Sequence, residues 1–397
     1  MDRRVLARRI FDAGVAAADP EAAVGAHLAT VAAPALIVSV GKAARRMATP
    51  AMAAFPGVRT LIVTNYENAG AVEGAEVLAA GHPVPDPNGE AAGRAVIAAL
   101  SEADGPVLTL ISGGGSALLP APAEGITLAE KARVNAALLA SGLDIRGMNL
   151  VRQQLSRLKG GGMLRAAAPH PVTALILSDV IGDDLSAIAS GPTVAPLGTA
   201  PEARALLEEV NIWDIMPESV KERLSRPASH ADLPLARNIL VGSNALSVAA
   251  MAEAAGPCVV LDPPVEGDVA DAATRICDAA GPGITLWGGE TTVQIRGGGK
   301  GGRNQELALR IACEARARGW TDWACLQGGS DGRDGPVDAA GGLVDHGTLN
   351  RIAAAGGDVD RLLANNDSYA ALSLAGDLLM TGATGTNVAD LGVLIRG

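Results

Sequence analysis

Short apolar runs that end in polar or glycine residues constrain the fold of this chain most strongly. Runs of this kind are typical of strands buried on both faces of a sheet. They are ALIVSVG (35–41), TLIVTN (60–65), PVLTLIS (106–112) and TALILSD (173–179). Helical patterns separate them, around residues 43–54, 88–101, 127–142 and 149–159. Strands separated by helices indicate parallel β-α-β units, so we predict an α/β protein that begins with a doubly wound, Rossmann-like sheet.

The length of the chain, 397 residues, exceeds what one hydrophobic core usually organises. Proline-rich stretches between about residues 190 and 236 bracket two short helical patterns and place a domain boundary near residues 225–240. Apolar runs and helical patterns alternate again after it, in NILVG, PCVVLD, ITLWGGE, TTVQIR and WACLQG. We predict two three-layer α/β/α domains, residues 1–235 and 236–397, with an active-site cleft between them.

The charge and the cysteines of the chain exclude several classes of protein. The formal net charge of -11 argues against nucleic acid or an anionic membrane as a partner. The four cysteines are widely spaced and form no C-x-x-C pair, which indicates reduced thiols in a cytoplasmic protein without a zinc site. The first 20 residues have the pattern of an amphipathic helix rather than a signal peptide. No apolar run approaches the ~20 residues that span a bilayer.

Two segments at predicted strand ends have the character of a phosphate site. SGGGS (112–116) follows an apolar strand directly, and its glycines allow backbone N–H groups to converge on an anion beside the Ser112 and Ser116 hydroxyls. A tight turn is the alternative. Lys42 follows another strand and enters a helix, where a cation opposes the helix dipole. We therefore expect Lys42 to face a compensating anion, although a surface lysine would also fit.

The stretch RGGGKGGRNQE (296–306) allows two interpretations. Its glycines satisfy the letters of G-x-G-x-x-G, which suggests a dinucleotide cofactor. The preceding TTVQIR alternates polar and apolar residues, however, unlike the buried first strand of a dinucleotide-binding domain. Arg303, Asn304 and Gln305 would open the next helix, where free amides favour an anion. We prefer an anion-holding loop, with a glycine-rich hairpin and a solvated arginine as the alternative.

Positive charge gathers in residues 146–165 of this acidic chain. Arg152 and Lys159 lie seven residues apart, so a helix over 149–159 would place them on one face. That face is either solvated or supplies the charge that an anionic substrate needs. His82, in GHPVPD, lies near a likely strand end and is a candidate for substrate binding.

Carboxylates follow two of the predicted strands. Asp179, Asp183 and Asp184 lie at a strand end and the following helix start, and Asp331 lies in GSDGRDGPVD. Helix capping and Asx turns account for each of them singly. Together they also suit Mg²⁺, which prefers oxygen ligands and substrate phosphates.

Taken in order, these segments resemble the class II glycerate kinase family, whose C-terminal region is called the MOFRL domain. The resemblance covers nearly the whole chain. The matching stretches are VGKAA (40–44), GHPVPD (81–86), SGGGSALLPAP (112–122), MNLVRQQLSRLKGG (148–161), LSDVIGDDLSAIASGPT (177–193), GGETTV (288–293), GKGGRNQELAL (299–309), SDGRDGPVDAAGG (330–342), NNDSYAAL (365–372) and TGATGTNVADL (381–391). Gln154, Ser330 and Ala383 depart from the pattern, where the family usually has histidine, threonine and proline.

The resemblance implies phosphorylation of D-glycerate by ATP and Mg²⁺, giving 2-phosphoglycerate. Some relatives carry the name hydroxypyruvate reductase, so NAD(P)H-dependent reduction is the alternative activity, and a sensor without turnover is a third. The expected partners are glycerate and ATP, with no nucleic acid and no membrane. Whether the protein forms a homodimer is left open.

The resemblance also implies roles for single residues. Lys42 and Arg303 are the expected catalytic residues, and replacing either by alanine should lower kcat far more than stability. The expected nucleotide-binding residues are Ser112, Gly113, Gly114, Gly115, Ser116, Lys159, Thr386 and Asn387. Substrate binding is assigned to Arg152, His82, Asn304 and Glu290, and metal binding to Asp179, Asp183, Asp184 and Asp331.

Overall fold

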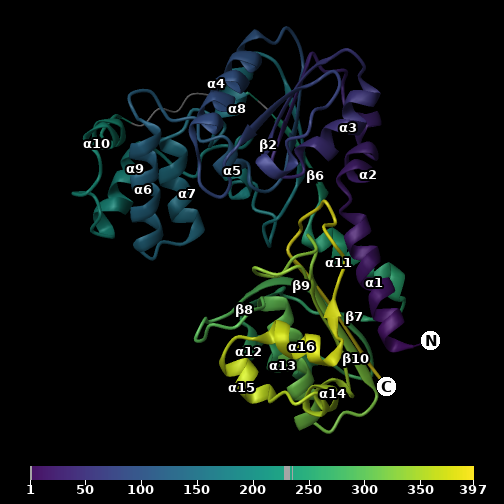
Figure 1. The fold of residues 1–397 in the computed structure, drawn as a ribbon. Helices are drawn as coiled ribbons and strands as arrows, with labels where there is room; N and C mark the ends of the chain where they lie inside the picture. Colours follow the sequence, from purple (N-terminus) through teal and green to yellow (C-terminus); the bar gives the residue numbers. More distant parts are fainter. Residues whose placement is uncertain (1, 228–232, 235) are drawn as a thin grey trace. The chain divides into compact units, whose positions relative to one another are not determined.

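The computed structural model describes residues 2–227, 233–234 and 236–397. The chain forms two compact units (Figure 1). The N-terminal unit consists of Pro20–Ser178 and Asp183–Val241, and the C-terminal unit of the first 19 residues, Asp179–Gly182 and Gly242–Gly397. The first helix, α1 (Arg3–Ala17), therefore belongs with the C-terminal unit. The division after residue 235 stays a prediction.

The N-terminal unit is built on a sheet with the strand order β3-β2-β1-β4-β5-β6. Its strands are β1 (Leu36–Val40), β2 (Arg59–Asn65), β3 (Glu76–Ala80), β4 (Val107–Ile111), β5 (Val172–Leu177) and β6 (Ala236–Gly242). The pairs from β3 through to β5 are parallel. This order confirms the predicted Rossmann-like sheet. The sequence analysis missed β3 because this strand, EVLAA, is only partly buried and lacks a long apolar run.

Helices cover both faces of this sheet. Leu36, Val38 and Val40 of β1 pack in one core with α4 and α8, whereas α3 contacts β1 and β2 with side chains outside that core. The helices of the unit are α2 (Pro20–Gly25), α3 (Ala44–Ala54), α4 (Pro87–Glu102), α5 (Gly115–Leu118), α6 (Leu128–Ala140), α7 (Ile145–Gln154), α8 (Gly162–Ala167), α9 (Ala200–Glu209) and α10 (Glu218–Leu224), with short 3₁₀ turns at Leu28–Thr30, Tyr66–Asn68 and Ile188–Ser190.

A helical subdomain extends the N-terminal unit. Helices α6, α7, α9 and α10 lie together beside the sheet (Figure 1). They share a core that includes Val134, Val151, Leu207 and Val220. The proline-rich region therefore contributes the two short helices expected there, α9 and α10, and both pack within the N-terminal unit.

The C-terminal unit has a mixed sheet with the order β12-β11-β10-β13-β9-β7, and β8 pairs with β9. Its strands are β7 (Val259–Val260), β8 (Val265–Asp268), β9 (Gly283–Thr292), β10 (Trp323–Gly329), β11 (Gly341–Asp345), β12 (Leu378–Leu379) and β13 (Asp390–Arg396). Its other helices are α11 (Asn244–Ala255), α12 (Val269–Ala279), α13 (Arg303–Ala317), α14 (Thr348–Ala354), α15 (Val359–Ala364) and α16 (Ser368–Ala375). The pairs β9–β13, β13–β10, β10–β11 and β11–β12 are antiparallel.

Side chains of this second sheet alternate between two cores, which gives the unit three layers. Leu286 packs with α1 and α11, whereas its neighbour Trp287 packs with α12 and α13 on the other face. One local expectation is wrong. TTVQIR is not a strand of its own, because its first two residues end β9 and the segment from Val293 to Gly302 forms no strand.

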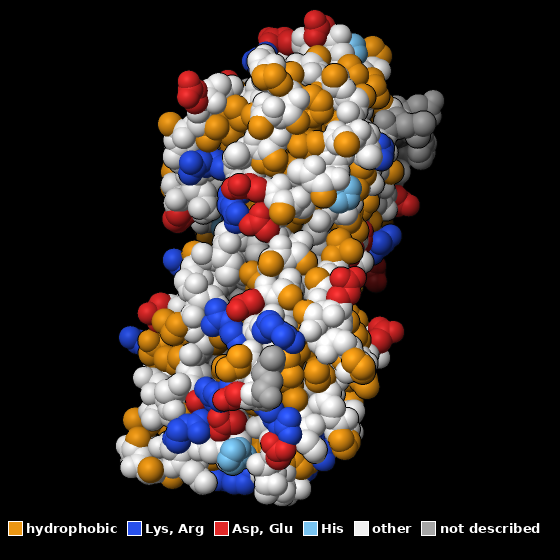
Figure 2. Space-filling view, turned by 90° about the vertical axis from the view of Figure 1, so that its right-hand side faces the viewer, with side chains coloured by type: hydrophobic (Ala, Val, Ile, Leu, Met, Phe, Trp, Pro, Cys, Tyr) orange, Lys and Arg blue, Asp and Glu red, His pale blue; other side chains and the backbone are white. Residues whose placement is uncertain are grey.

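Two observations are relevant to partners. No helix in the described part of the chain is long and apolar enough to cross a membrane. On the face shown in Figure 2, Lys and Arg side chains lie among Asp and Glu side chains. The charges on this face are therefore mixed and do not gather into a basic stripe.

Candidate active site

The loops that follow β1 and β4 in the N-terminal unit are hydrogen-bonded to each other. The two strands are paired in parallel, with Val40 opposite Ile111. Beyond them, the Lys42 amide donates to Gly113 O (2.9 Å) and the Ala43 amide donates to Ser112 Oγ (3.1 Å). A Cβ on Gly41, which has φ +124°, would lie 2.1 Å from Ser112 Oγ. Only glycine therefore allows the Lys42 loop to pack this closely on SGGGS.

The SGGGS loop presents unused backbone donors. The N–H groups of Gly113, Gly114 and Gly115 have no hydrogen-bond partner within the described residues. Gly114 adopts φ +85° and precedes the short helix α5. Successive free amides in such a turn form a concave site for an anion. The free amides are consistent with the predicted nest, and binding of an anion there stays a prediction.

Lys42 and His82 converge on this loop. A Cβ on Gly114 would lie 3.3 Å from both His82 Nε2 and Lys42 Cγ. The Lys42 side chain is exposed and forms no ion pair with the described residues. Burial, followed by the charge of Lys42, lowers the pKa of His82, and Glu67 opposes this effect. His82 is therefore a neutral imidazole near pH 7.

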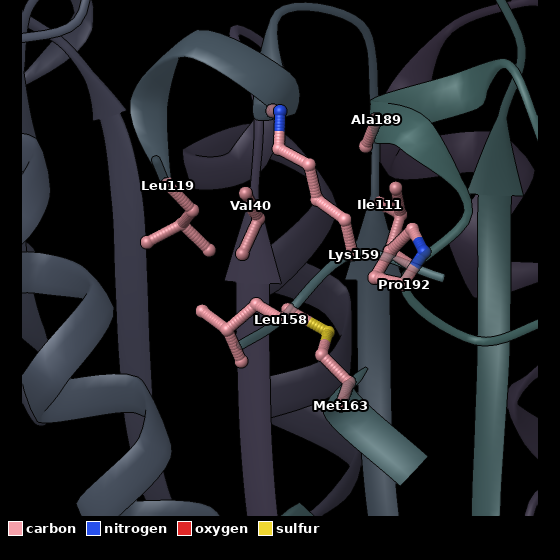
Figure 3. Close-up of a pocket in the computed structure, with 9 residues that line it drawn as sticks. Val40, Ile111, Leu119, Leu158, Lys159, Met163, Ala189 and Pro192 are labelled. Carbon is pink, nitrogen blue, oxygen red and sulfur yellow. The ribbon is translucent and has the colours of Figure 1, made fainter. Parts of the chain in front are cut away.

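Lys159 lies beneath the loop in an apolar pocket. Figure 3 shows its side chain extending past Val40, Ile111 and Leu158. It is only 4% exposed, and its Nζ donates to the backbone and hydroxyl oxygens of Ser116. Burial is the main cause that lowers the pKa of Lys159 well below its usual value. In the structure Lys159 supports the SGGGS loop from inside, and direct contact with a nucleotide stays a prediction.

Two further cations lie near Lys159. Burial, followed by the charge of Arg152, lowers the pKa of Lys131 to about 7. Arg152 donates to Asn135 Oδ1 through Nε (2.9 Å) and Nη2 (2.6 Å). None of the three cations has a carboxylate partner within the described residues. The predicted helix over 149–159 is too long, because α7 ends at Gln154 and leaves Lys159 in the following turn.

Arg303 occupies a different kind of environment in the C-terminal unit. Its guanidinium makes a two-pronged contact with Asp390, Nε to Oδ2 at 2.7 Å and Nη2 to Oδ1 at 3.1 Å. Nη1 donates to Glu290 Oε1 at 2.8 Å. Burial raises the pKa of Asp390 to about 6 although Arg303 acts to lower it. Arg303 is therefore already paired with two carboxylates, which the sequence analysis did not foresee.

A carboxylate of the chain itself occupies the start of α13. Asp334 accepts from the Asn304 amide (3.0 Å) and the Gln305 amide (2.8 Å), the donors that were expected to face an external anion. The amides of the glycine-rich loop before α13 are likewise bonded to side chains of the chain itself. The amides of Gly298 and Lys300 donate to Asn365 Oδ1 and Asp367 Oδ1 at 3.2 and 3.1 Å. The chain's own residues therefore occupy these amides, and an anion-holding role of the loop over 296–306 stays a prediction that rests on the Arg303 side chain.

The other two candidates for nucleotide binding in this unit have partners within it. Thr386 Oγ1 donates to Ala18 O at 2.6 Å and is buried. Asn387 Oδ1 accepts from the Ala389 amide at 3.1 Å. Both contacts hold the TGATGTN loop, so a role toward nucleotide stays a prediction for both residues.

The four metal candidates do not form a carboxylate cluster. Among the residues that the structure describes, no group of three or more His, Cys, Asp and Glu side chains is arranged to hold a metal ion. Asp184 Oδ1 accepts from the amide and hydroxyl of Ser186, and Asp331 Oδ1 accepts from the Arg333 amide. Asp183 differs, since its Oδ1 is buried without a hydrogen-bond partner in the described chain.

The residues that the sequence analysis missed have a common property. Lys131, Asn135 and Asp390 act through contacts with residues distant in the chain. No spacing pattern marks them, because the partners meet only in the folded units.

Comparison with known proteins places the chain in a family. The MOFRL family model matches residues 283–390, and the model for a domain of unknown function, DUF4147, matches residues 6–225. A protein of Agrobacterium vitis named putative hydroxypyruvate reductase is 40% identical over 419 residues, which cover 100% of this chain and 94% of that protein. The D-glycerate 2-kinase of Thermotoga maritima is 38% identical over 376 residues, which cover 90% of this chain and 89% of the kinase.

A solved structure agrees with these relatives. The crystal structure of glycerate kinase from Thermotoga maritima superposes with a TM-score of 0.92 at 36% identity and covers 99% of both chains. Similarity of this extent includes both units and their order along the chain. The chain therefore belongs to the class II glycerate kinase family, with a DUF4147 region followed by a MOFRL region.

Proposed function

We propose that this protein is a glycerate kinase that transfers the terminal phosphoryl group of ATP to D-glycerate, giving 2-phosphoglycerate. The observation that carries the proposal is the open SGGGS loop beside the unpaired Lys42. It provides free amides and a free cation at the carboxyl ends of parallel strands, where open α/β sheets bind ligands. The glycerate kinases among its relatives support the same reaction.

Phosphoryl transfer requires mainly positioning and neutralisation of charge. The amides of Gly113 to Gly115 would bind phosphate oxygens, and the Lys42 ammonium would neutralise charge on the transferring group. Lys159 would keep Ser116 in place from below, as a positioning residue. Its cationic neighbour Arg152 has the planar fork that suits the carboxylate of glycerate.

His82 supports the acceptor side of the reaction. Because its pKa is lowered, its imidazole is neutral near pH 7 and can accept a hydrogen bond from the hydroxyl that is phosphorylated. That proton leaves the hydroxyl as the new O–P bond forms. His82 lies beside Gly114, so the acceptor and the phosphate loop would be adjacent.

Magnesium fits this site through a small number of protein contacts. The unsatisfied Oδ1 of Asp183 is the carboxylate atom that we propose to hold it, together with phosphate oxygens of the nucleotide. Bound Mg²⁺ would neutralise charge on the phosphates. Asp179, Asp184 and Asp331 remain weaker candidates, because Asp184 and Asp331 already accept hydrogen bonds and the set forms no cluster.

Arg303 remains the second catalytic candidate. Its contacts with Asp390 and Glu290 use three of the five guanidinium N–H donors. Two donors are left for a phosphoryl oxygen, with Asp390 fixing the orientation of the group. That Arg303 and Lys42 act on the same phosphoryl group stays a prediction.

One set of assays tests the proposal against its alternatives. We expect glycerate, ATP and Mg²⁺ to give ADP and 2-phosphoglycerate, identified by ³¹P NMR, and hydroxypyruvate with NADH or NADPH to give no turnover. Reduction of hydroxypyruvate without glycerate-dependent ADP formation would contradict the proposal in favour of the reductase name. Binding of glycerate and ATP without either turnover would indicate a sensor. EDTA should abolish ADP formation and added Mg²⁺ should restore it.

A further inference from the structure

A basic pocket lies in the N-terminal unit, away from the SGGGS loop. Its volume is about 370 Å³, and Arg157, Arg165 and Arg223 are among its lining residues. This volume lies in the range of pockets that hold small molecules. The other walls come from Ile97 and Ser101, near the end of α4.

The topology separates this pocket from the proposed active site. Ser101 lies next to the end of α4, which leads into the start of β4, and Arg165 lies near the end of α8, which leads into the start of β5. Both therefore lie toward the amino ends of the strands. The Lys42 loop and SGGGS lie at the carboxyl ends of β1 and β4.

The three arginines have no carboxylate partner within the described residues. Arg165 Nη2 donates to Lys159 O at 3.4 Å, and Arg223 Nε donates to Gln154 O at 2.5 Å. The Arg157 side chain is exposed and makes no hydrogen bond with the described chain. Glu124 also lines the pocket and balances one of the three charges.

This concentration of charge requires a physical explanation, because the chain as a whole carries a net charge of -11. Burial is the main cause that lowers the pKa of the half-buried Arg223, whereas Arg165, whose pKa burial also lowers, keeps an exposed side chain. Guanidinium groups nevertheless stay protonated in proteins. Like charges held together in a partly buried pocket are stabilised by an anion, and guanidinium forks match phosphate oxygens.

We propose that this pocket is a second, non-catalytic binding site for a small phosphate-bearing anion. Arg157, Arg165 and Arg223 would donate to its phosphate oxygens from three sides. The site needs no turnover, so its test does not depend on the kinase proposal.

Calorimetric titration with glycerol 3-phosphate tests the site. The variant carries Arg157→Gln and Arg165→Gln, and the matched control carries Arg59→Gln and Arg94→Gln, two arginines whose side chains are 52% and 62% exposed. We expect the control to bind as the unaltered protein does, and the pocket variant to lose at least 10-fold in affinity for one binding component. Equal isotherms for all three proteins, or equal losses in both variants, would overturn the proposal.

Two further measurements distinguish the loss of the binding site from a folding defect in the double variant. Arg157→Gln alone removes an exposed side chain that makes no hydrogen bond with the described chain, and it should still weaken that component by about threefold or more for one lost charge. Crystals soaked in tungstate should show an anomalous peak within hydrogen-bond distance of Arg157 and Arg165. A peak at the SGGGS loop and none at the arginines would reject the site.

Discussion

Lys42 is exposed, unpaired and adjacent to unused backbone donors, so we expect its charge to serve a ligand rather than the fold. We expect Lys42→Ala to lower kcat about 10²–10³-fold, since loss of one preorganised charge contact costs roughly 2.7–4 kcal/mol. The thermal midpoint should change little. Steady-state kinetics and a melting curve measure both, with Lys221→Ala as the control. A kcat within threefold of the unaltered protein would exclude Lys42 from the reaction.

Arg303 should behave differently from Lys42, because its guanidinium pairs with the buried carboxylate of Asp390. Arg303→Ala leaves that acceptor without its partner and should lower the free energy of unfolding by about 1–3 kcal/mol. This revises the expectation from sequence that kcat would fall far more than stability. Arg303→Lys should restore part of the stability, since a point charge replaces the planar fork. Urea unfolding that is unchanged in Arg303→Ala would contradict the pairing.

Asp390 gives the stability of the protein a pH dependence. Burial raises its folded-state pKa to about 6, above the ordinary value, so folding favours the protonated carboxyl. Its contribution to the free energy of unfolding is full below about pH 4 and is lost as the pH rises through 6. When the pH rises from 4.5 to 7.5, the free energy of unfolding of the unaltered protein should fall as Asp390 loses its proton. Asp390→Asn has no proton to lose there, so its free energy of unfolding should fall less. Urea unfolding at both pH values measures the difference, and equal losses would show that Asp390 does not titrate there.

At the scale of elements, the two glycine-rich loops look alike in sequence and differ in structure. SGGGS keeps the amides of its three glycines free beside cations, whereas the amides of 296–300 are occupied by residues 365–367. Composition does not separate the two loops, because glycine allows both a ligand and another segment of backbone to approach closely. Only the neighbouring segments decide which of the two occupies the amides.

The central strands of the second sheet depend on a glycine for packing. Gly392 of β13 lies opposite Trp287 of β9, and a Cβ on it would come within 2.0 Å of the indole ring. We expect Gly392→Ala to destabilise the protein by about 1–3 kcal/mol, the usual cost of overpacking. Gly281→Ala is the matched control, because a Cβ there meets nothing within 4 Å. Thermal midpoints measure both variants, and similar values would show that the sheet accommodates the extra atom.

At the scale of the whole molecule, α1 completes the C-terminal unit from the opposite end of the sequence. Its Ala7, Ile10 and Phe11 are buried in one core with Leu326 and Val393. We expect deletion of residues 1–19 to raise hydrogen exchange in β10 and β13, because one face of their sheet loses its cover. Exchange in β1 and β4 should stay unchanged. Protection of β10 and β13 in the truncated chain would contradict this role of α1.

The fold was predictable wherever local pattern and burial agree. The four strands of the first sheet that are buried along most of their length appear within about two residues of their predicted bounds, because continuous apolar runs leave few other conformations. The partly buried β3 was missed, and VQIR was taken for a strand, because short or alternating segments depend on what packs against them.

The sequence by itself determined the α/β class, the parallel first sheet, the SGGGS and Lys42 segments at its strand ends, and the family resemblance. These features depend on residues close together in the chain. The tertiary structure alone decided that Asp334 occupies the start of α13, that Asp390 pairs with Arg303, and that Lys159 lies beneath Ser116. Each of these contacts joins residues 30 or more positions apart. A carboxylate or an amine that could serve a ligand serves the fold instead when folding brings a partner within hydrogen-bond distance.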